Sequence, residues 1–69
     1  MALTFQIGDL VRFAPHPAPI LGLPEIGLVM ECRELTHESR GYKYEVVRVQ
    51  FGDVDYTLPS SDFELVKRV

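Results

Sequence analysis

One stretch constrains the fold more than any other: residues 46–58, VVRVQFGDVDYTL, which predict a β-hairpin. A two-residue turn at Gly52-Asp53 suits the tight turns that hairpins prefer. The facing pairs expected from this turn are Phe51 with Val54, Gln50 with Asp55, Val49 with Tyr56, Arg48 with Thr57, and Val47 with Leu58. In each pair, either both side chains are apolar or aromatic, or both are polar. Because side chains alternate along a strand, a shift of one residue would destroy the match, so the register is well specified.

The length of 69 residues indicates one small domain, residues 1–69, with a thin margin of stability. A single cysteine, Cys32, excludes an intramolecular disulfide and favours a reducing setting. The first residues lack the basic and apolar pattern of a signal peptide, and no apolar run reaches the roughly 20 residues that cross a bilayer. We therefore expect a cytoplasmic location (the host cytoplasm for a phage protein) and no membrane association.

Ten acidic residues against seven basic ones give a net charge of −3. An acidic balance disfavours a domain that grips phosphate backbones. The nearest approach to a basic cluster, in residues 40–48, is interleaved with glutamates, and the basic tip Lys67-Arg68 is expected to aid solubility. We expect another protein as the partner, no nucleic acid, and a monomer or a weak homo-oligomer that pairs through open sheet edges.

Further strands are expected at residues 5–13, 25–35, 42–51 and 63–69, with a polar turn at 36–41 and a 3₁₀ turn at 59–62. In the second strand, alternation places Leu28, Met30 and Cys32 inward, but Val29 breaks the pattern. This predicts a bulge or a strand buried on both faces near Gly27, with a helix as the competing interpretation. The expected core consists of Ile7, Val11, Phe13, Leu28, Val47, Val49, Phe51, Val54, Leu58, Phe63 and Leu65.

Four segments share their pattern of core and turn residues with small barrels: IGDLVRF (7–13), IGLV (26–29), VQF (49–51) and LPSSDFELV (58–66). In these segments the chain resembles SH3-like barrels of the KOW, Tudor and PsaE types, and small phage or bacterial proteins. The resemblance implies a five-stranded antiparallel SH3-like barrel and only a loose class of function. The chain departs from KOW modules in its proline-rich loop, residues 14–24, and from peptide-binding SH3 domains in having no tryptophan.

No motif for catalysis stands out. Cys32 and His37 offer two ligands where structural zinc needs four. Asp53 is explained by the turn, and Asp55 by its partner Gln50 across the ladder. We predict a protein that is not an enzyme, with no catalytic, cofactor-binding or metal site.

The outward face of the third strand carries the clearest functional signal. Parity places Tyr42, Tyr44 and Val46 there, beside the turn at 36–41, and exposed aromatic residues are enriched where partners bind. The alternative is a bulge near Val46-Val47 that turns Tyr44 into the core. The loop at 14–24 is interpreted either as a lid on the barrel or as a docking segment. The candidate partner-binding residues are Pro17, Pro19, Leu21, His37, Arg40, Tyr42, Tyr44 and Val46.

These observations predict a non-enzymatic protein-interaction or accessory (adaptor) module. The alternatives are a KOW- or Tudor-like module associated with nucleic acid or ribosomes, and a small subunit of a larger assembly, photosynthetic or phage-encoded.

Overall fold

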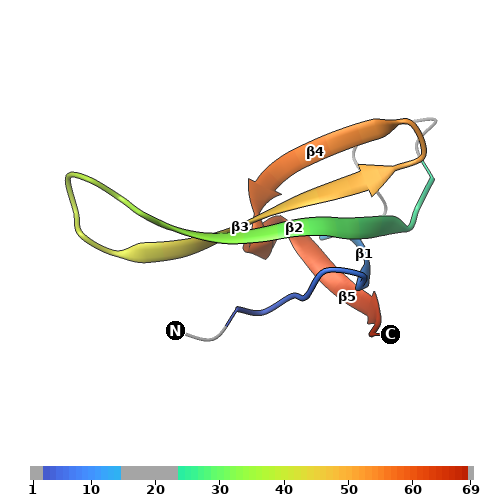
Figure 1. Cartoon of the computed structure of the whole chain (residues 1–69), viewed down its shortest axis with the longest axis horizontal. Helices are drawn as coiled ribbons and strands as arrows, with labels where there is room; N and C mark the ends of the chain where they lie inside the picture. The colour runs from blue at the N-terminus through green and yellow to red at the C-terminus, as the bar shows by residue number, and fades with distance from the viewer. Residues whose placement is uncertain (1–2, 15–23, 69) are drawn as a thin grey trace.

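The computed structural model describes residues 3–14 and 24–68 and shows an all-β domain. All strands pair antiparallel in one five-stranded sheet, in the order β4-β3-β2-β1-β5 (Figure 1). The elements are β1 (Leu10–Phe13), β2 (Gly27–Thr36), β3 (Lys43–Phe51), β4 (Val54–Pro59), the 3₁₀ turn η1 (Ser60–Asp62) and β5 (Phe63–Lys67). The predicted class, strand number and 3₁₀ turn are confirmed. The pairings form an open sheet with β4 and β5 at its edges.

The hairpin of β3 and β4 has the predicted register in all five pairs, from Phe51↔Val54 to Val47↔Leu58. Gly52 begins the turn with a φ of 60°, and Asp53 has no positive φ. This combination is the sign pattern of a type II′ turn, which matches the twist of the two strands. On the inner face, Val47 and Val49 are fully buried.

A bulge in β2 sets which of its side chains face the core. Val29 pairs with Val49 and Glu31 with Arg48, so Met30 is the extra residue. A bulge was expected near Gly27, and it lies three residues further on. Val29 is fully buried, whereas Met30 and Leu28 are exposed, so the prediction that these two point inward is wrong. Period-two alternation fails here because the bulge reverses the parity of the strand.

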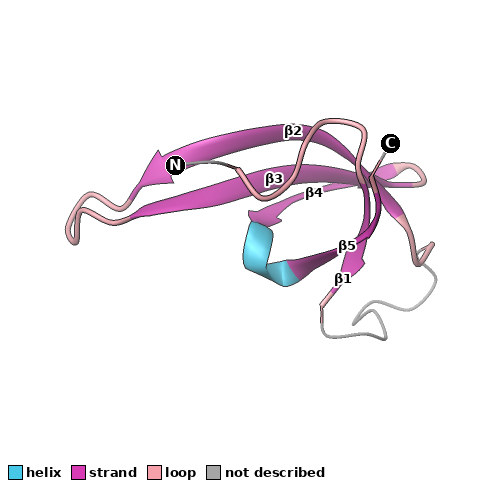
Figure 2. Ribbon diagram, turned by 90° about the horizontal axis from the view of Figure 1, so that it is seen from below, coloured by secondary structure: helices cyan, strands magenta, loops and turns pink. Residues whose placement is uncertain are grey.

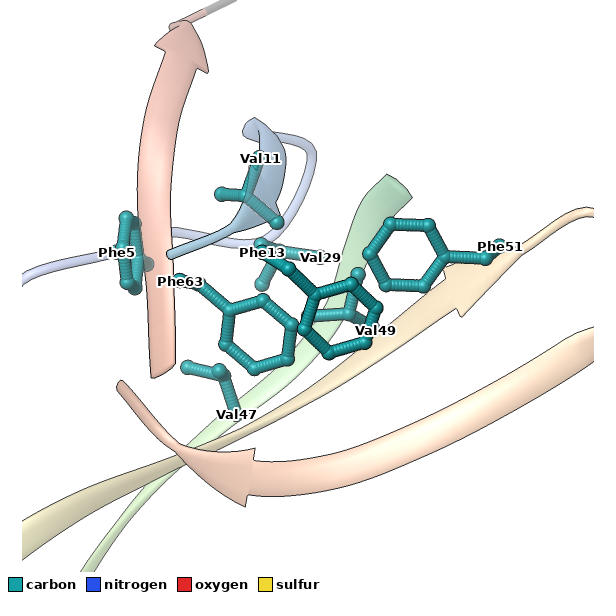
Figure 3. Packing of buried hydrophobic residues seen from close by; sticks show 8 residues of the cluster. All are labelled: Phe5, Val11, Phe13, Val29, Val47, Val49, Phe51 and Phe63. Carbon is teal, nitrogen blue, oxygen red and sulfur yellow. The ribbon is translucent and has the colours of Figure 1, made fainter. Parts of the chain in front are cut away.

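Aromatic rings fill the space enclosed by the bent sheet (Figure 3). Phe13 stacks on Phe51 with ring centroids 4.9 Å apart, and Phe63 lies 5.2 Å from Phe13. Phe5, which precedes the first strand, also enters this cluster and was not predicted as core. The buried cluster consists of Phe5, Val11, Phe13, Val29, Val47, Val49, Phe51 and Phe63.

Besides Leu28, three predicted core residues are exposed: Ile7, Val54 and Leu65. Ile7 lies in a turn rather than in a strand, because the ladder begins only at Leu10. Val54 and Leu65 lie on the edge strands β4 and β5, where one side of the strand has no neighbouring strand. Alternation reports which face a side chain is on, and not how deeply that face is covered.

The distal part of the β2–β3 pair projects from the body as a two-stranded arm, residues 34–45 (Figures 1 and 2). β4 ends its pairing at Val46↔Pro59, so β3 has no partner from β4 within the arm. At the tip, the His37 N–H donates to the Tyr42 carbonyl and the Gly41 N–H donates to the His37 carbonyl, both at 2.8 Å. The tip is therefore a closed turn.

Among the described residues, no helix has the length and apolar character required to cross a membrane.

Gly27 should be intolerant of substitution, because a Cβ there would lie 2.5 Å from Val49 Cγ1 and 2.8 Å from the Phe51 ring. We expect Gly27→Ala to lower the free energy of unfolding by about 1–3 kcal/mol through overpacking. Urea denaturation measures the change. The exposed control Thr57→Ala should stay within about 0.5 kcal/mol of the parent protein. An unchanged Gly27→Ala midpoint would contradict the close approach.

Candidate functional site

One face of the arm carries apolar and aromatic side chains: Leu35, His37, Tyr42 and Tyr44. Leu35 and Tyr44 are register partners. The His37 ring stacks on Tyr42 at 4.9 Å between centroids, and Tyr42 lies 6.0 Å from Tyr44. Tyr42 remains 51% exposed, and Leu35 is exposed as well. We call this surface the aromatic face.

The opposite face of the arm is polar. Thr36 is paired with Lys43, and Glu34 is paired with Glu45. The Lys43 ammonium lies 3.6 Å from the Glu34 carboxylate. A two-stranded ribbon is only marginally stable by itself in water. The ring contacts of the aromatic face therefore help to hold the arm in one conformation.

The structure places the sequence-predicted site residues as follows. Tyr42 is exposed, Tyr44 is half-buried, and no register shift interrupts β3 near Val46, so the alternative bulge there is absent. Val46 itself is only 9% exposed, which corrects the expectation that it stands on the open surface. Its register partners, Arg33 on β2 and Pro59 on β4, flank it on the same face of the sheet, and their side chains reduce its exposed area. Arg40 is exposed at the tip. Pro17, Pro19 and Leu21 lie outside the described residues.

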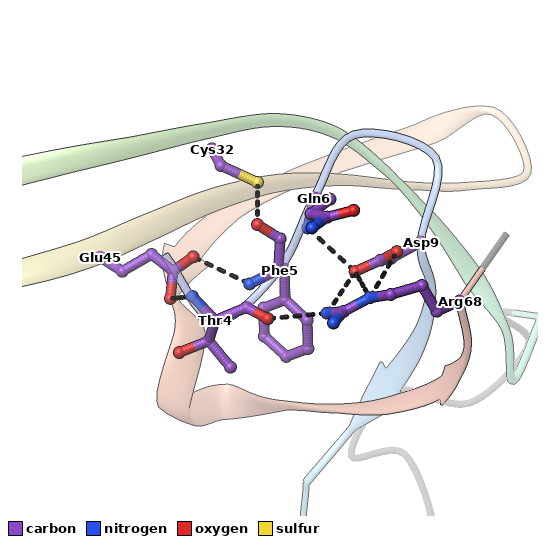
Figure 4. Close-up of polar contacts among 7 residues, drawn as sticks. All are labelled: Thr4, Phe5, Gln6, Asp9, Cys32, Glu45 and Arg68. Atoms are coloured by element: carbon purple, nitrogen blue, oxygen red, sulfur yellow. Dashed lines mark hydrogen bonds and ion pairs between the residues drawn. The ribbon is translucent and has the colours of Figure 1, made fainter. Parts of the chain in front are cut away.

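A second constellation holds the segment before β1, residues 3–6, which we call the strap (Figure 4). Glu45, 6% exposed, accepts hydrogen bonds from the N–H groups of Thr4 and Phe5 at 3.0 and 3.1 Å. Arg68 donates to the Thr4 carbonyl at 2.9 Å, and the Cys32 thiol donates to the Phe5 carbonyl at 3.3 Å. Side chains, rather than a neighbouring strand, thus bind the backbone of the strap.

Asp9 completes this constellation and is 1% exposed. It accepts a hydrogen bond from the Gln6 N–H at 2.9 Å and forms an ion pair with Arg68 at 3.0 Å. The Asp9 N–H donates back to the Gln6 carbonyl at 3.0 Å, closing a turn in which Gly8 has a φ of 97°. From the sequence, Asp9 was expected to mark a bend and Arg68 to aid solubility. No local pattern links residues so far apart in the sequence.

The contacts shift the pKa values of Asp9, Glu45, Cys32 and Arg68. The Arg68 hydrogen bond lowers the pKa of Asp9 despite burial. Burial raises the pKa of Glu45, but hydrogen bonds from the Phe5 and Thr4 N–H groups outweigh it, so the net pKa lies below the ordinary value. Burial, aided by the charge of Glu45, raises the pKa of the Cys32 thiol, which therefore stays protonated as a donor. Glu45, expected to be a solvated charge, is thus a buried structural carboxylate.

An open hollow of about 480 Å³ lies beside the strap, lined by Leu3, Phe5, Gln6, Ile7 and Cys32. Its lining is mostly apolar. Across the described ranges 3–14 and 24–68, no group of three or more His, Cys, Asp or Glu side chains could hold a metal ion.

Within the described part of the chain, cations on several strands form ion pairs with carboxylates. The pairs are Arg12–Glu64, Arg33–Glu31, Lys43–Glu34, Arg48–Asp55 and Arg68–Asp9. Each of these cations lies beside a carboxylate, so the cations do not form a basic stripe.

Comparison of the chain with protein-family models, curated proteins and solved structures gives no match.

The lowered pKa of Glu45 predicts acid sensitivity. The unfolded chain binds a proton at this carboxyl near pH 4, before the folded chain does, so this stabilisation is present at higher pH and is lost as the pH falls. We expect Glu45→Gln to cost about 1–3 kcal/mol at pH 7, because charged hydrogen bonds to two N–H groups are weakened. Its stability should also fall less steeply between about pH 5 and pH 3.

Urea denaturation at several pH values measures both effects. Glu38→Gln is the control, since Glu38 is exposed in the turn at the arm tip, away from Glu45. This variant should retain the acid dependence of the parent protein. An equally steep acid dependence in Glu45→Gln would show that this carboxyl does not carry it.

Proposed function

We propose that the chain is a non-enzymatic protein-interaction module, an accessory or adaptor subunit, whose arm docks its aromatic face on an apolar surface of a partner protein. The observation that carries this proposal is the arm itself. It extends beyond the end of β4 and exposes Leu35 and Tyr42 on one ordered face.

The chemistry of the aromatic face suits a protein partner. Tyrosine buries a large area on binding while losing little side-chain entropy, and its hydroxyl can bond to a partner at the rim. The stack of His37 on Tyr42 and the contact of Tyr42 with Tyr44 order these rings in advance. Rings that are already ordered reduce the entropy lost on association.

We further propose that the five strands belong to the SH3-like class of small barrels. Support comes from the strand order, in which β5 returns to pair with β1, and from η1 placed between β4 and β5. A cytoplasmic location is part of the proposal and rests on the lone cysteine.

The remaining polar groups favour a binding role over catalysis or nucleic-acid recognition. Asp9, Glu45 and Cys32 use their polar atoms to hold the strap. The ion pairs set carboxylates beside the cations that would otherwise contact phosphates, which disfavours a KOW- or Tudor-like role.

The double variant Tyr42→Ser/Tyr44→Ser tests the proposal. We expect the free energy of unfolding to fall by well under the roughly 2–5 kcal/mol typical of a core deletion. Association with the partner should be lost, because the ring area is gone. The measurement is affinity capture from cells that express the chain, followed by binding of each captured protein in purified form.

The control is Glu34→Gln/Lys43→Gln, which changes the opposite face of the arm and should leave binding intact. A collapse of the fold in the tyrosine variant, or a partner that binds both variants equally well, would refute the aromatic face as the docking surface. A salt-dependent shift of labelled RNA or DNA at micromolar protein would instead favour a nucleic-acid module.

A further inference from the structure

The strap is bound in the way a protein binds a peptide ligand. The N–H groups of Thr4 and Phe5 both go to Glu45. Their carbonyls accept from Arg68 and from the Cys32 thiol. All four backbone groups are thus satisfied by side chains from distant parts of the chain. Figure 4 shows these groups converging on the strap from β2, β3 and the C-terminal end.

A single side chain anchors the strap. Phe5 is buried in the same cluster as Val47 and Phe63 (Figure 3), whereas Leu3 and Ile7 on either side are exposed. The open hollow lies beside the strap and is lined by described residues of the strap, the turn that follows it and β2. The strap is therefore held by one ring and a set of polar contacts, all of which an identical segment could reproduce.

The strap joins the sheet through a tight turn. The turn of residues 6–9 requires a φ of 97° at Gly8, in the region that favours glycine. Opened into an extended conformation, the steps from Gln6 to Asp9 would span roughly 10 Å. The strap could then reach a second molecule that lies against this end of the sheet.

We use the word seat for the groups that hold the strap, which are Cys32, Glu45, Asp9, Arg68 and the buried cluster around Phe5. We propose that this seat also binds the strap of a second copy of this chain, giving a dimer by reciprocal exchange. The strap is the segment shown to fit the seat, and its hydrogen bonds with Glu45, Arg68 and Cys32 can form again between two molecules.

Opening the turn releases the Gly8 N–H from the Val29 carbonyl, which it contacts at 2.9 Å. Ile7, 73% exposed, lies in the hinge turn and adds apolar surface where the two exchanged chains would cross. Exchange of an identical element is a low-cost route to dimers.

This dimer does not depend on the aromatic face, because the strap and the arm tip contribute different residues. The two proposals are tested through different residues, Gly8 and Phe5 for the exchange and Tyr42 and Tyr44 for docking, so the failure of one is distinguishable from the failure of the other.

The test is Gly8→Val, assayed by sedimentation velocity over a concentration series. Valine disfavours the positive φ of the closed turn but suits the extended hinge of the dimer. A valine at positive φ destabilises each closed turn by about tenfold in the equilibrium constant between the closed and the extended turn. The dimer contains two extended hinges, so its dissociation constant should fall by about 100-fold relative to the parent protein.

Gly41→Val is the matched control. Gly41 also has a positive φ, 73°, and, as at Gly8, a Cβ added there would meet open space. It lies in the arm turn, away from the hinge, so its substitution should leave the dimer dissociation constant unchanged. Adding Phe5→Ala to Gly8→Val should restore the monomer, because the anchor is lost.

In mixtures of labelled and unlabelled Gly8→Val protein, the Phe5 ring should give intermolecular NOEs to the buried cluster of the other copy. A folded Gly8→Val protein that stays monomeric would overturn the proposal. So would dimerisation of Gly41→Val to the same extent, or NOEs from Phe5 that are all intramolecular.

A second measurement uses the unmodified chain in case Gly8→Val fails to fold. A peptide of residues 2–9 added to ¹⁵N-labelled protein should shift the amide signals of Cys32 and Glu45. A peptide with alanine at the position of Phe5 should not. The absence of any shift at millimolar peptide would also overturn the proposal.

Discussion

The architecture at the ends of the chain depends on two buried carboxylates, Asp9 and Glu45. Burial of a charge is costly unless hydrogen bonds or an opposite charge compensate it. Glu45 obtains two backbone N–H groups of the strap, and Asp9 obtains Arg68 and the Gln6 N–H. These contacts join the start of the chain, the middle of the sheet and the C-terminal end. In so small a domain they allow Phe5, which lies outside every strand, to complete the core.

The same contacts connect the body to the arm. Glu45 is the last residue of the arm on β3, and Val46, the next residue, is buried between Arg33 and Pro59. The arm is therefore fixed at its base from both faces of β3, by the strap on one face and by flanking side chains on the other. A ribbon of two strands gains little stability from its own pairing. Its fixed base and its ring contacts together explain how an ordered aromatic face can stand beyond the sheet.

How far the sequence predicts this structure depends on the range of each interaction. The register of β3 and β4 follows from local matching across the Gly52-Asp53 turn, and it is confirmed pair by pair. The bulge was signalled by Val29, although its position at Met30 was not. Burial at sheet edges depends on which strands become neighbours, so the exposure of Leu65 was missed. Glu45 and Arg68 were interpreted as solvated charges because their partners lie 40 or more residues away.

The candidate site shows the same division. Parity along β3 identified Tyr42 and Tyr44 correctly as neighbours on one face, but only the structure shows that this face belongs to a free-standing ribbon. The rings that are available to a partner are also the rings that hold the arm in shape. A partner that covered them would bury their exposed area and would stabilise the arm by mass action, since the bound state requires the ordered ribbon. Binding and local order in the arm should therefore rise together, whereas the strap end of the sheet is stabilised by its own carboxylates.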